Sequence, residues 1–553
     1  MRIGSVHPAN SQRATWWRAS VMVGALLSAA CTSGPFRSPA PGSNDRTAAV
    51  HLLNRATYGA RPEDIEALLR DGVDSWLERQ FQPPRTLAKA TPTEIAQPPA
   101  SGDPGAVMML QPTTPQQPLR LNPAQAMGAL VHAKLERAVV SERQLEEVMT
   151  DFWFNHFNVF YNKGQVRLAL GDYEQNAIRR HVFGRFEDML TATAQHPAML
   201  VYLDNFMSTV APVSPPAGQR RPRGGLNENY ARELLELHTL GVEGGYTQQD
   251  VIEVARAFTG WGIVNSTTQK ARPVTPTEAR TFASVGFQFH PERHDTGEKV
   301  VLGQTLAGGR GMEDGLDVLR LLARHPATAQ HVARKLVRHF VADDPPPELV
   351  SELAAVFRQT DGDLRAVTRA LFRAKAFYDP AHYRTKTKRP FEFVASALRL
   401  TGARVEQSQA LVQQLRAFGH LPYSEPAPTG YPTVAEEWLS AGAMMNRMRF
   451  AIDLVAGRVA GVQFPTTALL GVSGQPAADR RQSGPVESAS ALDTAAIQAL
   501  TTAVLRQLLP GVPPEQMATL IADDLASQPT AERRAVAARI AALVLGSPEF
   551  QRY

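Results

Sequence analysis

The sequence is poor in cysteine and in net charge. Cys31 is the single cysteine among 553 residues, so the chain can form neither an internal disulfide nor a cysteine-rich metal site. The formal net charge is +5, and it falls to about +2 when the three arginines among the first 18 residues are set aside. A domain with so little excess positive charge lacks the basic surface typical of nucleic-acid binding. The composition therefore predicts no nucleic-acid partner.

Motifs that identify common reaction classes are also missing from the region expected to fold. The sequence there contains no H-E-x-x-H zinc motif, no G-x-S-x-G nucleophile motif, no phosphate-binding P-loop and no dinucleotide fingerprint. Chemistry of an unfamiliar kind would leave the sequence looking the same. The sequence therefore defines no reaction, and whether the protein is an enzyme stays open at this point.

The N-terminus has the pattern of an export signal. Arginines precede a short apolar run at residues 19–27, and small residues from Ser28 to Ala30 follow it. A run of this length is typical of a signal peptide and is too short to span a membrane. We predict a signal peptide over residues 1–30 and an exported protein of the periplasm or outer membrane.

Cys31 stands directly after these small residues, as in the cleavage site of bacterial lipoproteins. We predict that Cys31 is lipidated and that this anchor holds the protein at a membrane. Ser28 departs from the leucine or valine common at its place, so ordinary signal cleavage and secretion are the alternative. Residues 32–46 are rich in Pro, Ser and Gly and are predicted to form a flexible tether.

Residues 47–553 are predicted to form one large, mainly α-helical domain. Apolar residues recur at three-and-four spacing, with Pro and Gly as breaks, most clearly in four successive segments: 312–325, 327–341, 347–359 and 363–376. Segments rich in Pro predict insertions or long loops near residues 82–123, 211–225 and 464–490. A small β-hairpin is expected from the alternating residues 285–289 and the apolar run 299–302.

The stretch from Gly224 to Gly262 carries the clearest local pattern. Asn227 is a good N-cap for a helix that Gly241 should end, and Thr247 with Asp250 resembles a capping box for a second helix. The first of these helices is apolar over most of its circumference, which predicts burial. A narrow polar stripe remains on it, formed by Asn229, Arg232, Glu233 and Glu236.

Two interpretations of this stripe stay open. In the first, Arg232 pairs with Glu236 one turn away and Glu233 faces water. In the second, Glu233 and Glu236 are metal ligands or acid/base groups and Asn229 orients them. His238 lies nearly opposite the carboxylates on a helix, so it cannot share an ion with them.

Histidines elsewhere supply the other candidate ligands for a divalent metal. His156 lies in the apolar stripe of a helix expected over residues 141–160, as a core residue or as a ligand or base in a cleft. His290, His294 and Asp295 are close in sequence and could bind zinc, although turn chemistry explains them equally well. The metal hypothesis therefore requires Glu233 and Glu236 to share a metal ion with side chains from distant segments of the chain.

Several segments together resemble one bacterial family, domain of unknown function 1800. They are HLLNRATYGA at 51–60, FWFNHF at 152–157, NENYARELLELHTLGVEGGYTQQDVIEVARAFTGW at 227–261, HDTGEKVVLG at 294–303 and LGSPEFQ at 545–551. The resemblance implies an exported, mainly helical protein, often encoded beside a sulfatase-like secreted protein that would be its partner. It implies no agreed activity and therefore no catalytic residues. Phe154 stands where members often have histidine, which weakens a two-histidine site there.

Two hypotheses about function follow. The first is an exported protein of the cell envelope that serves as a helical scaffold or binding module for a secreted partner. The alternative is a metal-dependent hydrolase or transferase of the envelope, with Glu233, Glu236, Asn229, Arg232 and His156 as its candidate catalytic residues.

Overall fold

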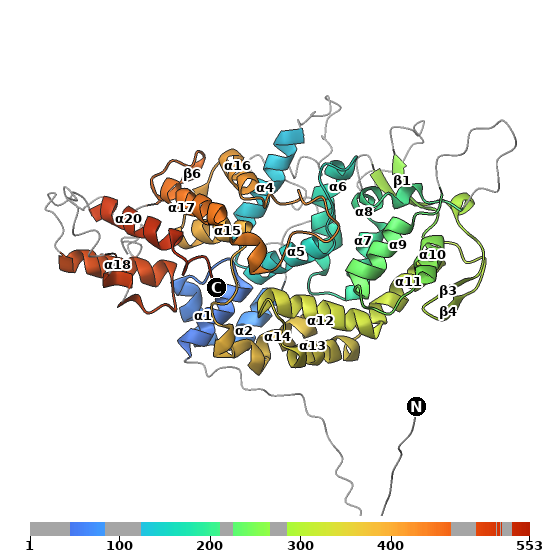
Figure 1. Cartoon of the computed structure of the whole chain (residues 1–553), viewed down its shortest axis with the longest axis horizontal. Coiled ribbons are helices and arrows are strands. Elements are labelled where there is room, and N and C mark those ends of the chain that lie inside the picture. The colour runs from blue at the N-terminus through green and yellow to red at the C-terminus, as the bar shows by residue number, and fades with distance from the viewer. Residues whose placement is uncertain are drawn as a thin grey trace, which may run out of the picture. The chain divides into compact units, whose positions relative to one another are not determined.

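Helices make up most of the computed structural model, which describes residues 45–82, 123–210, 225–265, 285–465, 494–515, 517–519, 521 and 533–553 (Figure 1). All of these residues lie in the compact unit of residues 39–553. The mainly α fold class is confirmed. The expected signal peptide, Cys31, the tether and the three expected insertions lie outside the described residues, apart from a few residues at their ends.

The first part of the chain consists of short and medium helices. Their bounds are α1 (Arg46–Ala56), α2 (Pro62–Phe81), α4 (Pro123–Val140), α5 (Gln144–His156), α6 (Val166–Asp172), α7 (Phe186–Gln195) and α8 (Pro197–Tyr202). Gly72 interrupts α2 with a φ of +79°, a conformation that glycine adopts without strain. A π-helical turn, η1 (Tyr173–Ile178), extends α6 toward α7.

The middle and last parts are helical too. Their helices are α9 (Glu228–Glu233) with the π-helical turn η4 (Leu234–Thr239), α10 (Gln248–Ala257), α11 (Glu313–Arg324), α12 (Pro326–Phe340), α13 (Pro347–Gln359), α14 (Leu364–Arg373), α15 (Pro390–Thr401), α16 (Gln409–Ala417), α17 (Ala441–Val455), α18 (Thr494–Leu508) and α20 (Arg533–Gly546). The four successive helices expected between residues 312 and 376 are confirmed as α11 to α14. Proline at the first position of α12 and α13 suits a site where no amide hydrogen is needed.

Three small antiparallel strand pairs accompany the helices among the described residues. They are β1 (Trp261–Asn265) with β2 (Val285–Phe289), β3 (Lys299–Val301) with β4 (Gln304–Leu306), and β5 (Arg404–Val405) with β6 (Val462–Gln463). The expected hairpin between 285–289 and 299–302 is wrong, because each of these strands has another partner. Leu302 and Gly303 both have positive φ, which is the geometry of a tight two-residue turn joining β3 to β4.

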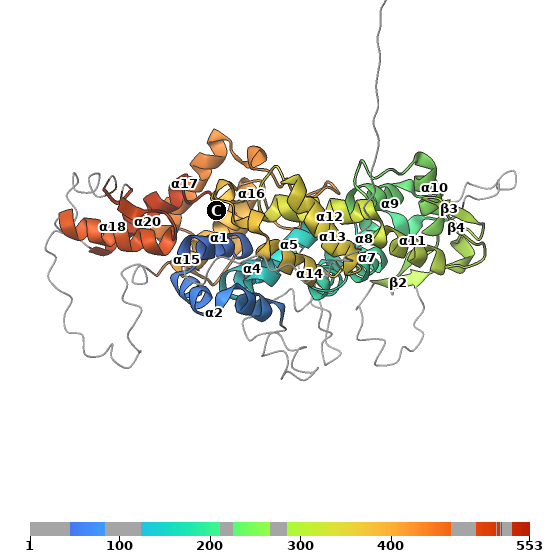
Figure 2. The ribbon, with the colours of Figure 1, turned by 90° about the horizontal axis from the view of Figure 1, so that it is seen from below.

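One hydrophobic core runs through the described residues and includes side chains from α1 to α20. All twelve residues of α15 are buried, so this helix packs on every side. In both views α12 lies along α13, and α17 lies beside α20 (Figures 1 and 2). Strand β3 packs on α10, which places the segment after residue 290 next to the central helix pair. Within the described residues, no helix combines the length and the apolar character needed to cross a membrane.

Candidate functional site

The helix that carries the polar stripe begins where the sequence predicts. The Asn227 side chain accepts hydrogen bonds from the backbone N–H groups of Asn229, at 2.9 Å, and Tyr230, at 3.2 Å. These bonds satisfy amides that the first turn of a helix leaves without partners. After two turns the helix widens into η4, where the Thr239 hydroxyl donates to the carbonyl of Leu234 at 2.6 Å. π-helical turns are rare in proteins, and those that occur are often found at functional sites.

Arg232 does not pair with Glu236, so that expectation is wrong. Its guanidinium lies 3.5 Å from Glu228, one turn earlier, and donates to Gln248 of α10 at 2.9 Å. The π turn begins between residues 232 and 236 and changes the register of the two side chains. Arg232 therefore helps to join α9 to α10.

Glu233 and Glu236 are half-buried and lie close enough for their charges to interact. Partial burial raises the pKa of Glu233, the charge of Glu236 adds to this increase, and Arg232 opposes it. Glu236 accepts a hydrogen bond from the Tyr246 hydroxyl at 3.2 Å. Asn229 is exposed on the same helix. This arrangement could move a proton or attract a cation at the surface.

His156 lies in the core, at the end of α5, with 2% of its surface exposed. Its Nε2 donates to the carbonyl oxygen of His238 at 3.0 Å, and its Nδ1 has no hydrogen-bond partner. Burial lowers the pKa of His156 well below its ordinary value, and the nearby Lys335 lowers it further. The ring packs edge-on against Trp153 and Phe157. His156 is thus a neutral histidine among aromatic side chains.

Two more histidines surround it. The rings of His238 and His331 lie 6.2 and 6.1 Å from the ring of His156. Burial lowers the pKa of His238 to about 3 and that of His331 to about 4, with Lys335 contributing in both cases. Burial also lowers the pKa of Lys335 to about 8. The three histidines are therefore neutral at pH 7, because burial and the nearby charge of Lys335 both oppose their protonation.

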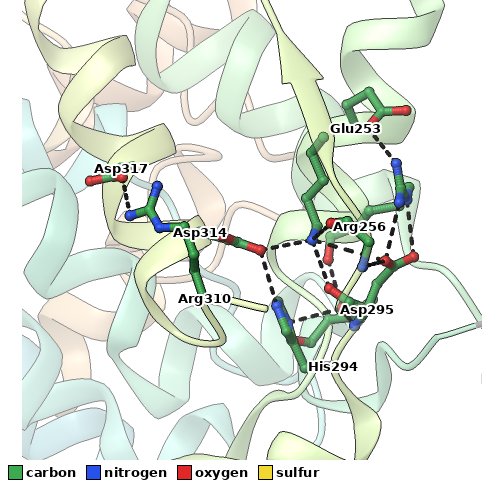
Figure 3. Close-up of polar contacts among 10 residues, drawn as sticks. Glu253, Arg256, His294, Asp295, Arg310, Asp314 and Asp317 are labelled. Atoms are coloured by element: carbon green, nitrogen blue, oxygen red, sulfur yellow. Dashed lines mark hydrogen bonds and ion pairs between the residues drawn. The ribbon is translucent and has the colours of Figure 1, made fainter. Parts of the chain in front are cut away.

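His294 points inward, toward α11 (Figure 3). Its Nε2 lies 3.2 Å from Oδ2 of Asp314, and its Nδ1 lies 2.8 Å from the carbonyl oxygen of Thr259. Lys299, at the start of β3, donates to the same Asp314 oxygen at 2.7 Å and to the carbonyl of Asp295 at 2.6 Å. The side chains of His294, Lys299 and Asp314 are all buried, so this network fixes the segment from His294 to Lys299 to α11.

Asp295 takes a different partner (Figure 3). Its two carboxylate oxygens accept hydrogen bonds from Nε and Nη2 of Arg256 on α10, at 3.0 and 3.1 Å. Arg256 also donates to Glu253 at 2.6 Å. His294 and Asp295 are adjacent in sequence, but their side chains serve two different ion pairs and do not converge on one point.

The residues of the metal hypothesis thus occupy three separate settings. Glu233 and Glu236 are half-buried on α9 and η4, His156 is in the aromatic core, and His294 with Asp295 belongs to ion-pair networks. Within the described ranges, no group of three or more His, Cys, Asp or Glu side chains is arranged to hold a metal ion. The structure brings the two glutamates together but does not bring the histidines to them.

A second charged cluster, which the sequence did not reveal, lies between α4, α5, η1 and α15. Lys134 lies 3.0 Å from Asp151 and 3.4 Å from Glu174, and Tyr423 donates to Glu174 at 2.7 Å. Burial by itself would raise the pKa of Glu174, but Lys134, Arg137 and Arg179 outweigh it and hold the pKa at about 2. Buried charges require such partners.

Arg389, at the N-terminus of α15, continues this cluster. It donates to Asp151 at 2.8 Å and to Oε1 of Glu392 at 2.7 and 2.9 Å. The sequence holds one sign of this charged cluster: Asp151 interrupts the apolar residues of α5 between Val148 and Phe152. Its partners are distant in the chain, so no local spacing could have identified them.

Two hollows among the described residues are lined by side chains of both α1 and α15. The first is a small cavity, here called the Arg55 cavity, lined among others by Arg55, Tyr58, His339, Lys388, Ser396 and Tyr553. The second, here called the arginine pocket, is open and has a volume of about 810 Å³. Its lining includes Arg46, Arg61, Glu63, Arg399 and Arg506, from α1, α2, α15 and α18. Its size is that of a typical ligand site.

The fold and these sites define a mainly α-helical protein whose interior is organised by aromatic packing and by ion-pair networks. Residues 51–552 match the family model described as protein of unknown function (DUF1800), and the chain belongs to that family. Comparisons with curated proteins and with solved structures gave no match. Family membership therefore confirms the resemblance seen in the sequence, and it supplies no reaction.

Proposed function

We propose that this protein is an exported binding module of the cell envelope, anchored through lipid on Cys31, which receives an acidic segment of a secreted partner protein in the arginine pocket. The observation that carries the proposal is the pocket itself. It has the volume of a ligand site, and four arginines but one carboxylate side chain are among its lining residues.

The charges around the pocket are unequally satisfied. Arg399 pairs with Asp64 at 2.9 Å, and Arg61 pairs with the same carboxylate at 3.0 Å. Arg46 pairs with Glu66. Arg506 is exposed and has no carboxylate partner among the described residues. Arg506 is therefore the lining arginine available to an acidic side chain that enters the pocket, and complementary charge of this kind gives specificity and speeds association.

The secreted sulfatase-like protein encoded nearby, which the family resemblance implies, is the partner to test. Binding between that protein and a soluble mature form carrying Cys31→Ser is measured by calorimetry at low and high salt. We expect Arg506→Glu to weaken binding at least tenfold, because it places a negative charge where an acidic segment docks. Arg416→Glu is the matched control: it makes the same charge change at an exposed arginine on α16, away from the pocket.

Equal binding by Arg506→Glu and Arg416→Glu, or no binding of the wild type, would contradict the proposed pocket. Anchoring is tested separately by the intact mass of the protein from the membrane fraction. We expect the mass of a lipid on the mature N-terminus, and its loss together with membrane association in Cys31→Ala.

The alternative function, a metal-dependent hydrolase or transferase, draws on one observation. Partial burial and the neighbouring charge of Glu236 raise the pKa of Glu233, as in carboxylate pairs that transfer protons. This reading requires a metal that the two glutamates bind without His156 or His294. Metal analysis of the purified protein decides between the two functions.

A further inference from the structure

Arg55, in the last turn of α1, is a buried cation without a carboxylate partner among the described residues. It is 2% exposed. Its Nη2 donates to the carbonyl of His382 at 2.6 Å and lies 3.3 Å from the Thr385 hydroxyl. Its Nε and Nη1 have no hydrogen-bond partner. The guanidinium lies over the Tyr553 ring, 5.0 Å from its centre, but this contact gives the two nitrogens no hydrogen-bond acceptor. A buried guanidinium with two unsatisfied nitrogens is costly, because these N–H groups have lost water without gaining an acceptor.

Lys388 is a second such cation. Its Nζ lies 3.0 Å from the Ser396 hydroxyl and 3.8 Å from the centre of the Phe550 ring. No carboxylate of the described residues lies within ion-pair distance of it. Burial lowers the pKa of Lys388 to about 7 and that of Arg55 to about 10. Both shifts show how weakly the surrounding protein compensates these charges.

The neighbouring carboxylates are already engaged. Glu392 accepts two hydrogen bonds from the Arg389 side chain, and Asp151 is held by Lys134 and Arg389. Both carboxylates line the cavity together with three cations, Arg55, Lys388 and Arg389, and among the described residues neither carboxylate forms an ion pair with Arg55 or Lys388. The local balance of buried charge is therefore positive.

Arg55 and Lys388 line the same cavity. The volume open to the centre of a water molecule there is about 20 Å³. That is room for about one water molecule or one atom of similar size. A serine beside a lysine can act as a nucleophile with its base. The cavity has no space for an acyl group beside Ser396, so Ser396 and Lys388 do not have this role in this conformation.

We propose that the Arg55 cavity is a binding site for a single halide ion, chloride under ordinary conditions, held by Arg55 and Lys388. A halide has the right size, accepts N–H hydrogen bonds and neutralises the charge that no side chain neutralises. A water molecule matches the volume but leaves both cations uncompensated. The ion would stabilise the packing of α1 against α15. This inference is independent of the proposed function, because the arginine pocket is lined by a different set of residues.

Thermal unfolding of the mature protein in sodium chloride and in sodium gluconate at equal ionic strength tests the site. We expect Tm to rise with the logarithm of the chloride concentration above Kd, by about 3 °C at one hundred times Kd, since a ligand of the folded state stabilises it by mass action. Arg55→Met should remove this dependence. Arg179→Met should keep it, because it also deletes a buried guanidinium, but one that is paired with Glu147 and does not line the cavity.

Equal Tm in the two salts, or the same chloride dependence in Arg55→Met as in the wild type, would overturn the proposal. Crystals of the wild type grown with sodium bromide give a readout that does not depend on a folded variant. An anomalous peak between Arg55 and Lys388 supports a halide. Density in the cavity without an anomalous signal identifies a water and refutes it.

Discussion

Replacing Arg389 with methionine is expected to lower the free energy of unfolding by about 3–5 kcal/mol, the usual effect of breaking a buried ion pair from one side. Arg389 is 5% exposed and donates three hydrogen bonds to the carboxylates of Glu392 and Asp151. Methionine fills part of the same space but donates none. The variant leaves two buried negative charges short of a partner.

The remaining contacts place the effect toward the lower end of that range. Asp151 keeps Lys134 at 3.0 Å. Glu392 keeps the backbone N–H of residue 389 at 2.7 Å and the Tyr553 hydroxyl at 3.3 Å. A second substitution, Glu392→Leu in the Arg389→Met background, should recover part of the loss, because it removes one of the two uncompensated charges.

Urea unfolding at pH 7, followed by circular dichroism, measures the change. Arg185→Met is the matched control, since it removes an exposed arginine paired with Asp361 and should cost less than about 1 kcal/mol. Wild-type stability in Arg389→Met, within about 1 kcal/mol, would refute the claim that this network is buried and interdependent.

The pH dependence gives a second check. Burial by itself would raise the pKa of Asp151, but Lys134 and Arg389 hold it well below the ordinary value of 3.8. The stabilisation is therefore fully present above pH 3.8 and is lost as the pH falls below it. The difference between wild type and Arg389→Met should shrink over that acidic range.

Three further predictions concern the candidate sites and the core. Metal analysis of the purified protein should find no stoichiometric metal. The double variant Glu233→Ala, Glu236→Ala should keep the melting temperature within about 2 °C of the wild type, since both side chains are half-buried. If the wild type holds stoichiometric metal and the folded double variant has lost it, the result supports the metal-dependent function instead. In the same denaturation assay, Gly315→Ala should destabilise the protein by about 1–3 kcal/mol, because the added Cβ would lie 2.5 Å from the Trp261 ring. The control is Gly442→Ala in α17, where the added Cβ meets no atom within 4 Å, so this variant should be neutral or stabilising. Burial lowers the pKa of His238 from 6.5 to about 3, so its contribution to stability is present above pH 6.5 and is lost as the pH falls toward 3. The variant His238→Asn should therefore reduce the slope of unfolding free energy against pH, between pH 6.5 and 4.5, by up to one proton. An unchanged slope would show that His238 is not buried in neutral form.

The sequence by itself determined where several helices lie and where some of them end, although the helix expected over residues 141–160 is shorter and covers Gln144–His156. The caps at Asn227 and Thr247, including the capping box with Asp250, are formed as predicted, since each depends on residues within three positions of one another. The break at Gly241 has a positive φ, which glycine adopts without strain. The bounds of α13 are those read from proline and from the apolar spacing.

The pairing of side chains was decided by the tertiary structure alone. Asp151 pairs with Arg389 across 238 positions of chain, and Arg55 and Lys388 line one cavity only because α1 packs near the residues just before α15. In the same way, the tertiary structure decided that β2 pairs with β1 and that β3 pairs with β4. A local pattern fixes which face of a helix is apolar, but which distant charge lies opposite depends on how all the helices pack, and that information is spread over the whole chain.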